Sequence, residues 1–310
     1  MPDEPRVHVW TKTVPSREHP ARNEDLAWSS ANNIAHAVID GMGGSRRVVD
    51  GHDVGGEHAA AQLAAVLNER LQSLQDDLPA TSARELLAVV VAEAGARIYN
   101  MVNASGLIPR EQIPEGKTAE EVMAAAVMTA AILCDGGRRA VIGQSGDTRA
   151  YLFSDGELML LTQDEDAVMM DLRDGKLTAE EADALQEAMD SFSGRDIGQL
   201  DAGARGYFFR RNMLFGQIGD SEAPEPPEFA TIQLRPRDML VLVSDGVYAN
   251  LSSSEISDAL ASIDPAAALV DRADTRSGER SLPDAGDASA AYNYRAHADD
   301  ITAIVVQVTW

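Results

Sequence analysis

The chain has 310 residues, of which 45% are hydrophobic, and its 26 basic against 50 acidic residues give a formal net charge of −24 at pH 7. A chain of this length and apolar content can bury one large core or two ordinary ones. So acidic a surface repels nucleic acids and anionic membranes, which are themselves polyanions, and no basic cluster offsets it. These numbers argue against a protein that binds nucleic acid or a membrane surface.

The cysteine content and the N-terminal sequence restrict the compartment and the kind of site. Cys134 is the only cysteine, which excludes an intrachain disulfide and a multi-cysteine zinc site, and its apolar neighbours indicate a buried thiol. The N-terminus MPDEPRVHVW has neither the cationic flank nor the apolar stretch of a secretory signal. The apolar run before Cys134 is too short to span a bilayer. We therefore expect a soluble, cytoplasmic protein.

Strand and helix patterns alternate in the first half of the chain. A capping box formed by Ser82 and Glu85 predicts the start of the second helix. The SDGE segment at 154–157 is typical of a hairpin turn. By periodicity we expect strands at 7–14, 26–29 and 34–39, helices at 54–74 and about 82–102, and strands at 127–133, 139–142, 149–153 and 158–161.

The second half begins with a segment that interrupts this alternation. Residues 167–211 start with a surface helix, capped by Thr178 and Glu181, and continue in a glycine-rich stretch that we interpret as a mobile flap inserted into a single domain spanning 1–310. Strands are then expected at 229–234 and 239–243, helices at 253–262 and about 265–273, and a last strand after a long polar loop. This order predicts an α+β layered sandwich.

Three acidic residues lie at the ends of apolar, strand-like runs. Asp40 closes IAHAVID, Asp245 closes MLVLVSD, and Asp299 opens DDITAIVVQV. Each of the first two is followed by glycine, which allows a sharp turn or a close approach to a ligand. An Asp-Gly pair most often marks only a turn, but by composition a D-G-x-G-G string is expected in well under about 1% of chains this long. Converging carboxylates predict a site for Mg²⁺ or Mn²⁺ rather than zinc.

Seven segments, in order along the chain, resemble the motifs of one family. They are NEDLAW, AVIDGMGG, GGEHAAAQLA, GQSGDTRAYLFSDGELMLLTQDED, NMLFGQIG, LRPRDMLVLVSDGVYANLSSSEI and ADDITAIVV. Together they resemble the metal-dependent protein phosphatases of the 2C type, in a bacterial-like form. The resemblance implies a four-layer αββα sandwich of two antiparallel sheets flanked by helices. It also implies hydrolysis of phosphoserine and phosphothreonine in a phosphoprotein substrate.

The same resemblance implies a centre of two Mg²⁺ or Mn²⁺ ions, with a weaker third. It assigns to the metals the side chains of Asp40, Asp245, Asp299, Glu24, Asp25 and Asp147 and the carbonyl of Gly41. Such ions lower the pKa of water and neutralise charge on a phosphoryl group, so no nucleophilic side chain is needed. This agrees with the lack of a convincing cysteine or serine nucleophile.

Several neighbouring residues have a simpler structural interpretation. We expect Asp300 to be a hydrogen-bond partner, because one of two adjacent carboxylates usually faces away from a site. Arg149 is expected to form a structural ion pair, and Asp164 and Asp166 to be loop acids. His52 lies in an additional polar stretch and is interpreted as part of a surface loop.

The chain departs from the family where a phosphate-binding arginine commonly stands. Pro20 occupies that position, five residues before Asp25. Arg22 and Arg46 are the candidates to bind the substrate phosphate instead, because a guanidinium can hold two phosphate oxygens at once. The alternative for Arg46 is a solvent-exposed loop. Met42 stands where some relatives have a histidine proton donor.

The missing arginine leaves a second function open, a weak or inactive phosphatase-like scaffold that binds phosphoproteins or regulatory partners. The complete set of acidic ligands favours the enzyme. Relatives that lose activity are expected to lose ligand aspartates first, because clustered carboxylates without a metal repel one another.

Overall fold

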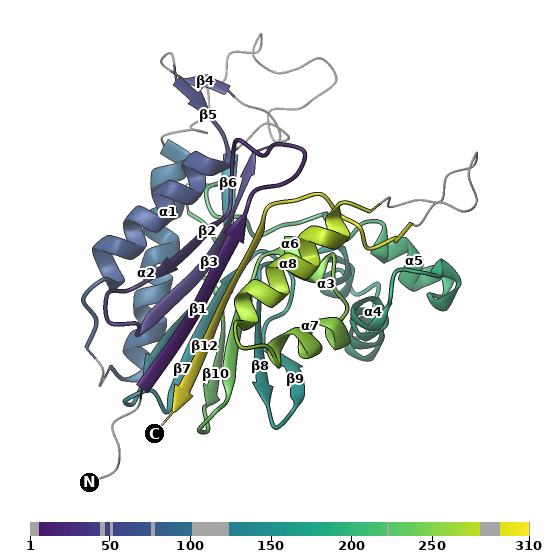
Figure 1. Cartoon of the computed structure of the whole chain (residues 1–310). Coiled ribbons are helices and arrows are strands. Elements are labelled where there is room, and N and C mark those ends of the chain that lie inside the picture. Colours follow the sequence, from purple (N-terminus) through teal and green to yellow (C-terminus); the bar gives the residue numbers. More distant parts are fainter. Residues whose placement is uncertain are drawn as a thin grey trace.

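Two five-stranded antiparallel sheets lie between two layers of helices (Figure 1). This computed structural model describes residues 6–43, 47–49, 52–75, 78–100, 124–221, 223–279 and 292–309. The first sheet has the order β1 (Arg6–Val14), β12 (Ile301–Thr309), β11 (Met239–Val243), β8 (Arg149–Ser154) and β9 (Glu157–Leu160). The second sheet has the order β10 (Glu228–Gln233), β7 (Arg139–Ser145), β6 (Ala124–Cys134), β3 (Ala35–Gly43) and β2 (Leu26–Ser29).

Each sheet is covered on its outer face by its own set of helices (Figure 1). The second sheet is covered by α1 (Gly56–Leu71) and α2 (Ala80–Ile98). The first sheet is covered by α6 (Asp245–Tyr248), α7 (Ser253–Leu260) and α8 (Pro265–Ser277). The expected four-layer αββα sandwich is therefore confirmed.

The first sheet is buried on both faces, and alternate side chains of its strands pack into two different cores. Successive side chains of a strand point to opposite faces. In β11, Leu240 and Leu242 pack in the core shared with the second sheet, whereas Val241 and Val243 pack in a separate core with α7 and α8. Since both faces must be apolar, the strand has the continuous hydrophobic sequence MLVLV. Cys134 is buried in the shared core, as expected.

Most element positions agree with the sequence, and one helix start is wrong. The second helix begins at Ala80, directly after Pro79, and Ser82 lies inside its first turn. Pro79 is extended, with φ −65° and ψ 145°. Proline suits a helix start, because its ring holds φ near helical values and the N–H that it lacks would have no helical partner there. The predicted hairpin is confirmed, since β8 and β9 pair through a turn in which Asp155 and Gly156 have positive φ.

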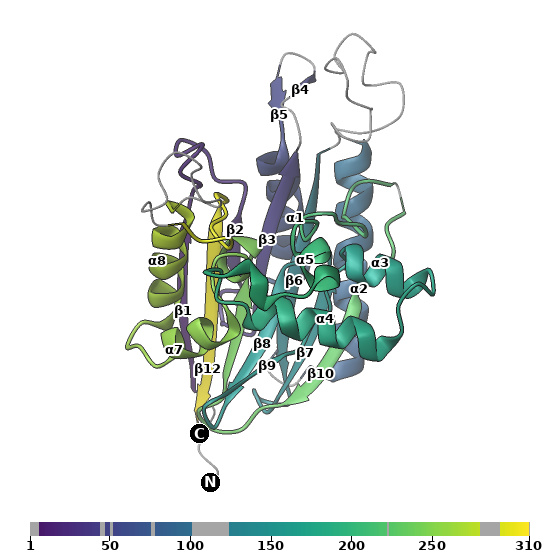
Figure 2. The same ribbon diagram turned by 90° about the vertical axis from the view of Figure 1, so that its right-hand side faces the viewer.

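The additional segment after β3 contains a short hairpin, β4 (Arg47–Val49) with β5 (His52–Val54). It projects beyond the end of the sandwich in both views (Figures 1 and 2). The predicted surface position of the His52 side chain lies outside the described part of the chain. In that part, no helix combines the length and apolar composition that crossing a bilayer requires.

The segment between β9 and β10 forms a small helical unit on one side of the sandwich (Figure 2). It contains α3 (Ala167–Arg173), α4 (Ala179–Ser191), a 3-10 turn (Ile197–Gln199) and α5 (Ala202–Phe208), packed around its own apolar cluster. The capping box of Thr178 and Glu181 is confirmed. The glycine content did not predict α5, whose start is capped by Asp201. Its function as a mobile flap, and the single-domain organisation, stay predictions.

A buried arginine joins this unit to the helices that follow β11. Arg295 is only 3% exposed. It donates hydrogen bonds to the carbonyls of Met189 at 2.8 Å and Phe192 at 3.2 Å, at the end of α4. It also donates to the carbonyls of Tyr248 and Leu251, the latter at 2.7 Å, at the end of α6. One guanidinium therefore satisfies carbonyls from two elements far apart in the sequence.

Replacing Arg295 by methionine should destabilise the protein strongly. The methionine side chain fills similar space but donates no hydrogen bond to the buried carbonyls. Each buried carbonyl left without a donor costs about 1–3 kcal/mol. We expect Arg295→Met to lower the free energy of unfolding by about 3 kcal/mol or more, measured by urea denaturation. Arg235→Met is the matched control, because the Arg235 side chain is 76% exposed. Equal midpoints for the two variants would contradict this role of Arg295.

Candidate metal centre

Ends of strands from both sheets bring five carboxylates together at one end of the sandwich. Asp40 lies in β3, and Asp25 directly precedes β2 in the same sheet. Asp245 directly follows Ser244 at the end of β11, and Asp147 and Asp299 each lie two residues before a strand of the first sheet, β8 and β12. The negative charges of the other four all raise the pKa of Asp40, so the five groups share one region. These are five of the six side chains that the resemblance assigned to metal.

The strand that carries Asp40 is longer than expected, since Asp40 was predicted to lie just past its end. β3 continues to Gly43, and Asp40 and Gly41 pair with Val127 and Ala126 of β6. The glycine is needed for a close approach, because a methyl group on Gly41 would collide with the carbonyls of Gly56 and Glu24. Gly41 therefore allows the start of α1 to pack directly against the strand that carries Asp40.

Asp245 also lies in a different element from the one predicted. It is the first residue of the one-turn helix α6, after Ser244 at the N-cap position. The Ser244 hydroxyl donates to Asp25 Oδ2 at 2.7 Å, and its oxygen accepts from the backbone N–H of Thr302 at 3.0 Å. Ser244 follows a strand of the first sheet and Asp25 precedes a strand of the second. This hydrogen bond therefore holds the two halves of the site together.

Burial and mutual repulsion make the ionised form of this cluster costly. Burial is the main cause that raises the pKa of Asp40, Asp25 and Asp245 well above the ordinary value, and the neighbouring carboxylates add to it. Burial also raises the pKa of Asp147 to about 6, although Tyr248 donates a hydrogen bond to it. The pKa of Glu24 rises to about 7, again mainly through burial.

Two buried carboxylate oxygens show where a cation fits. Asp147 Oδ1 and Asp245 Oδ1 have no hydrogen-bond partner among the described residues. A divalent cation would coordinate such oxygens and offset the repulsion between the carboxylates, and oxygen donors of this kind suit Mg²⁺ or Mn²⁺. The residues present therefore fit the expected metal.

Asp300 has the structural role that was predicted for it. Its Oδ1 accepts the backbone N–H of Ser16 and its Oδ2 that of Glu24, both at 2.6 Å. Asp300 is itself buried, with 3% exposed. It therefore holds the segment that carries Glu24 and Asp25 against the start of β12.

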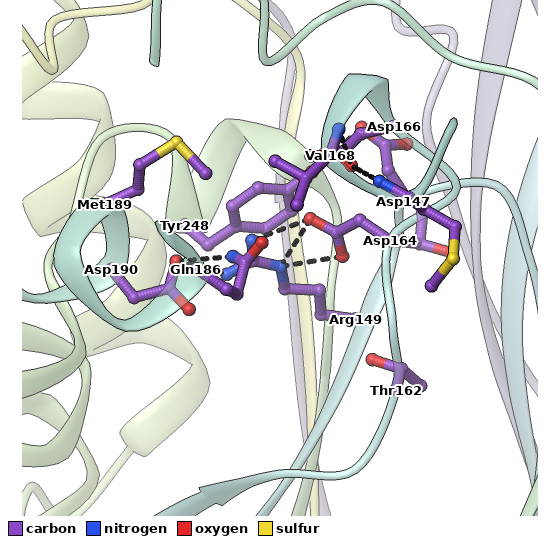
Figure 3. Close-up of polar contacts among 12 residues, drawn as sticks. Asp147, Arg149, Thr162, Asp164, Asp166, Val168, Gln186, Met189, Asp190 and Tyr248 are labelled. Carbon is purple, nitrogen blue, oxygen red and sulfur yellow. Dashed lines mark hydrogen bonds and ion pairs between the residues drawn. The ribbon is translucent and has the colours of Figure 1, made fainter. Parts of the chain in front are cut away.

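A second buried arginine links the insertion to the centre, as Figure 3 shows. Arg149 donates to Asp164 at 2.7 Å and to Asp190 of α4 at 2.9 Å, which confirms its predicted structural ion pair. Its guanidinium lies 3.7 Å from the centre of the Tyr248 ring, and the Tyr248 hydroxyl donates to Asp147 at 2.8 Å. Asp190 and Asp147 are thus connected through two side chains.

The two acids before α3 have distinct structural contacts. Asp164 is buried against Arg149 rather than being an ordinary exposed loop acid. Asp166 caps α3 by accepting the backbone N–H groups of Val168 and Met169.

Arg22, a candidate for binding the substrate phosphate, lies between two glutamates. Arg22 Nε lies 3.3 Å from Glu24 Oε1 and 3.4 Å from Glu57 Oε2, in the first turn of α1. Arg46 lies outside the described residues. Arg17, another arginine close to Pro20 in the sequence, forms a paired interaction with Asp274 on α8, at 2.9 and 2.6 Å, and so does not point to the centre.

Two further side chains near the centre, those of His297 and Arg211, were not predicted from the sequence. His297 Nε2 lies 3.0 Å from Asp299 Oδ2 and 3.8 Å from Asp245 Oδ2. Its signal was its position two residues before Asp299, because side chains at i and i+2 of an extended segment share a face. Arg211 follows α5, and its charge opposes the rise in the pKa of Asp245. No local pattern predicted its position, which depends on how the insertion folds back.

A hollow of about 390 Å³ opens beside these two side chains. It lies between the segment 209–213, which follows α5, and the segment 294–297, which precedes Asp299. Aromatic rings of Phe209 and Tyr294 line it together with Arg211 and His297. The side of the centre that faces the insertion therefore offers space for a ligand.

The sequence of this chain matches one protein family over most of its length. The family profile described as protein phosphatase 2C matches residues 21–285. The serine/threonine protein phosphatase PstP of Mycobacterium tuberculosis is 32% identical to the chain over 241 residues, which are 77% of this chain and 36% of PstP. The chain thus spans about a third of the length of that curated relative.

Solved structures share the fold. The PPM Ser-Thr phosphatase MsPP from Mycobacterium smegmatis, in complex with cacodylate, aligns with a TM-score of 0.59 at 22% identity over 97% of both chains. The catalytic domain of the serine/threonine protein phosphatase PstP, in complex with two manganese ions, aligns with a TM-score of 0.60 at 21% identity over 99% of both chains. At these identities the likeness shows the fold alone.

Without metal, the free energy of unfolding should fall as the pH rises from about 4 to about 7. The pKa of Asp147 is raised from 3.8 to about 6 and that of Glu24 from 4.5 to about 7. A raised pKa means that the folded state holds the proton more tightly. The stabilisation is therefore present below the unfolded pKa and is lost as the pH rises through the folded pKa. A shift of two units corresponds to about 3 kcal/mol.

Urea denaturation across this pH range, in a chelator and in Mn²⁺, tests this expectation. The slope should be visible in the chelator and largely absent with Mn²⁺, which binds the deprotonated site. Asp147→Asn should flatten the slope in the chelator. The same exchange at Asp155, whose side chain is 87% exposed, should leave the slope unchanged. A flat profile for the unmodified protein in the chelator would refute the repulsion.

Proposed function

This chain belongs to the protein phosphatase 2C family, and we propose that it is a serine/threonine protein phosphatase that hydrolyses phosphoserine and phosphothreonine with two Mn²⁺ or Mg²⁺ ions. The convergence of five carboxylates at one end of the sandwich, two of them with unpartnered buried oxygens, carries the proposal. The named activity of PstP and the manganese in the structure of its catalytic domain support it.

We assign the metal-holding roles to the residues that the motifs indicated. They are Asp40, Asp245, Asp299, Glu24, Asp25 and Asp147, with the carbonyl of Gly41. Bound there, two cations would make water a nucleophile near neutral pH and offset the charge of the phosphoryl group. A third, weaker ion would use Asp147 and Asp245.

Hydrogen bonds from surrounding residues hold the proposed metal-binding side chains in place. Asp300 and Ser244 fix the Glu24–Asp25 segment and the start of α6 through hydrogen bonds. The carboxylate cluster by itself repels a phosphate dianion, because like charges close together in a buried site interact strongly. Cations must therefore bind before the phosphorylated substrate does.

Arg22 and Arg46 are proposed to bind the substrate phosphate in place of the arginine that Pro20 replaces. Arg22 supports this because its guanidinium lies beside Glu24, next to the centre. The adjoining glutamates orient the guanidinium, and a partly exposed face remains, since 27% of its side chain is accessible. The phosphoprotein substrate and the cytoplasmic location are predictions from the sequence.

The alternative, a phosphoprotein-binding scaffold without turnover, is not favoured by this geometry. A scaffold has no need for a cluster of carboxylates that destabilises the fold in the absence of metal. All six acidic side chains assigned to metal are retained in the sequence.

Hydrolysis of a phosphothreonine peptide should depend on the metal and on Asp245. We expect turnover with Mn²⁺ or Mg²⁺, none after chelation, and a loss of about 1,000-fold or more in kcat/KM for Asp245→Asn, since metal assistance supplies several kcal/mol. Asp155→Asn, the same exchange at an exposed turn, should retain full activity. Turnover that persists in the presence of a chelator would contradict the metal-dependent mechanism. Tight Mn²⁺ binding without turnover would instead favour the scaffold.

Removing the arginines should weaken substrate binding more than turnover. A charge-assisted hydrogen bond to phosphate contributes about 1.5–3 kcal/mol, so Arg22→Ala and Arg46→Ala should each raise KM by about 10-fold or more, with kcat within about threefold. Steady-state kinetics on the peptide measure both constants. Arg17→Ala is the control, because that side chain is bound to Asp274. If KM in both variants matches that of the control, the phosphate is held by other groups.

A further inference from the structure

His297 is placed as a ligand would be placed relative to two of the proposed metal-binding carboxylates. Its Nε2, Asp299 Oδ2 and Asp245 Oδ2 are close together, with one ligand atom from each of the three residues lying within 4.8 Å of the others. The side chain of His297 is mostly buried, with 20% exposed, and its Nε2 points to both carboxylates. The imidazole therefore belongs to the wall of the metal centre.

The distances match the spacing of donor atoms around one cation. With metal–ligand bonds of about 2.1 Å, neighbouring donors lie about 3 Å apart and opposite donors about 4 Å apart. His297 Nε2 lies 3.0 Å from Asp299 Oδ2 and 3.8 Å from Asp245 Oδ2. A cation between the three groups would need little rearrangement of these side chains.

The backbone of His297 is also held in place relative to Asp245. Asn250, which is completely buried, accepts a hydrogen bond from the His297 N–H at 3.0 Å and donates to its carbonyl at 2.9 Å. The same side-chain amide donates to the carbonyl of Gly246 at 2.9 Å. Asn250 thereby ties the histidine to the turn that carries Asp245, and such support is typical of residues that must keep a ligand geometry.

We propose that His297 supplies a nitrogen ligand to the cation held by Asp245 and Asp299. This rests on the proposed two-metal function and adds to it a preference among metals. Imidazole nitrogen suits transition metal ions such as those of Zn, Fe and Ni best, and Mn²⁺, although it also favours oxygen ligands, accepts a nitrogen more readily than Mg²⁺ does. The centre should therefore bind Mn²⁺ more tightly than an all-oxygen site does, with little gain for Mg²⁺.

A second role is compatible with the shorter distance, and the experiment must separate the two. His297 Nε2–H would donate to Asp299 and orient that carboxylate, without touching the metal. The amide of Asn212, 3.4 Å from Nε2, is near enough to replace Asp299 as the partner of that nitrogen. In the ligand role the nitrogen lone pair faces the metal, whereas in the orienting role a proton occupies that position.

Pulsed electron paramagnetic resonance on the full chain with one equivalent of Mn²⁺ is the direct test. Nitrogen modulation from a bound imidazole should appear in the unmodified protein, change when the protein is labelled with ¹⁵N-histidine, and vanish in His297→Gln. Calorimetry should show that Mn²⁺ affinity falls by about 10- to 100-fold in His297→Gln and His297→Ala, with Mg²⁺ affinity changed by less than about threefold.

Glutamine keeps an N–H donor near the position of Nε2, so it separates the two roles. If His297→Gln retains the Mn²⁺ affinity that His297→Ala loses, the histidine only orients Asp299 and the proposal is overturned. Absence of nitrogen modulation in the unmodified protein overturns it without reference to any variant. Mn²⁺ binding with phosphatase turnover but no nitrogen signal removes this inference alone, whereas failure to bind Mn²⁺ removes the proposed function as well.

Discussion

Repulsion between carboxylates that the fold forces together is the constraint on which this structure depends. Asp25, Asp40, Asp147, Asp245 and Asp299 come from both sheets, and burial together with the neighbouring charges raises the pKa of Asp40 and Asp245. A protein gains no stability from this arrangement when it is ionised and empty. Part of the folding free energy is therefore used to hold these carboxylates together, at the site where we propose that cations bind.

Polar side chains around the centre keep it rigid against that repulsion. Ser244 connects the end of β11 to Asp25, and Asp300 binds two backbone N–H groups of the segment that approaches β2. Asn250 fastens the chain before Asp299 to α6. Each of these three residues is buried, and each joins segments that are distant in the sequence. Their hydrogen bonds determine where the clustered carboxylates lie.

The inserted helices are fastened to the same end of the sandwich by two buried arginines. Arg295 joins the end of α4 to the end of α6, and Arg149 joins Asp190 of α4 to Tyr248. Because Tyr248 also donates a hydrogen bond to Asp147, a displacement of α4 would shift a side chain that we propose to bind metal. The insertion thus has a physical connection to the centre through packed and hydrogen-bonded groups.

The sequence by itself determined the layered sandwich and three of the clustered carboxylates, while Asp25 and Asp147 were indicated only by the resemblance of their motifs to the family. Apolar periodicity separates strands from helices, and Asp40, Asp245 and Asp299 adjoin such runs, so local order along the chain contains this information. Only the tertiary structure decided that Gly41 serves helix packing rather than a turn, that Asp245 begins a helix, and that His297 and Arg211 reach the site. These outcomes depend on contacts between segments far apart in the chain, and no local pattern records such contacts.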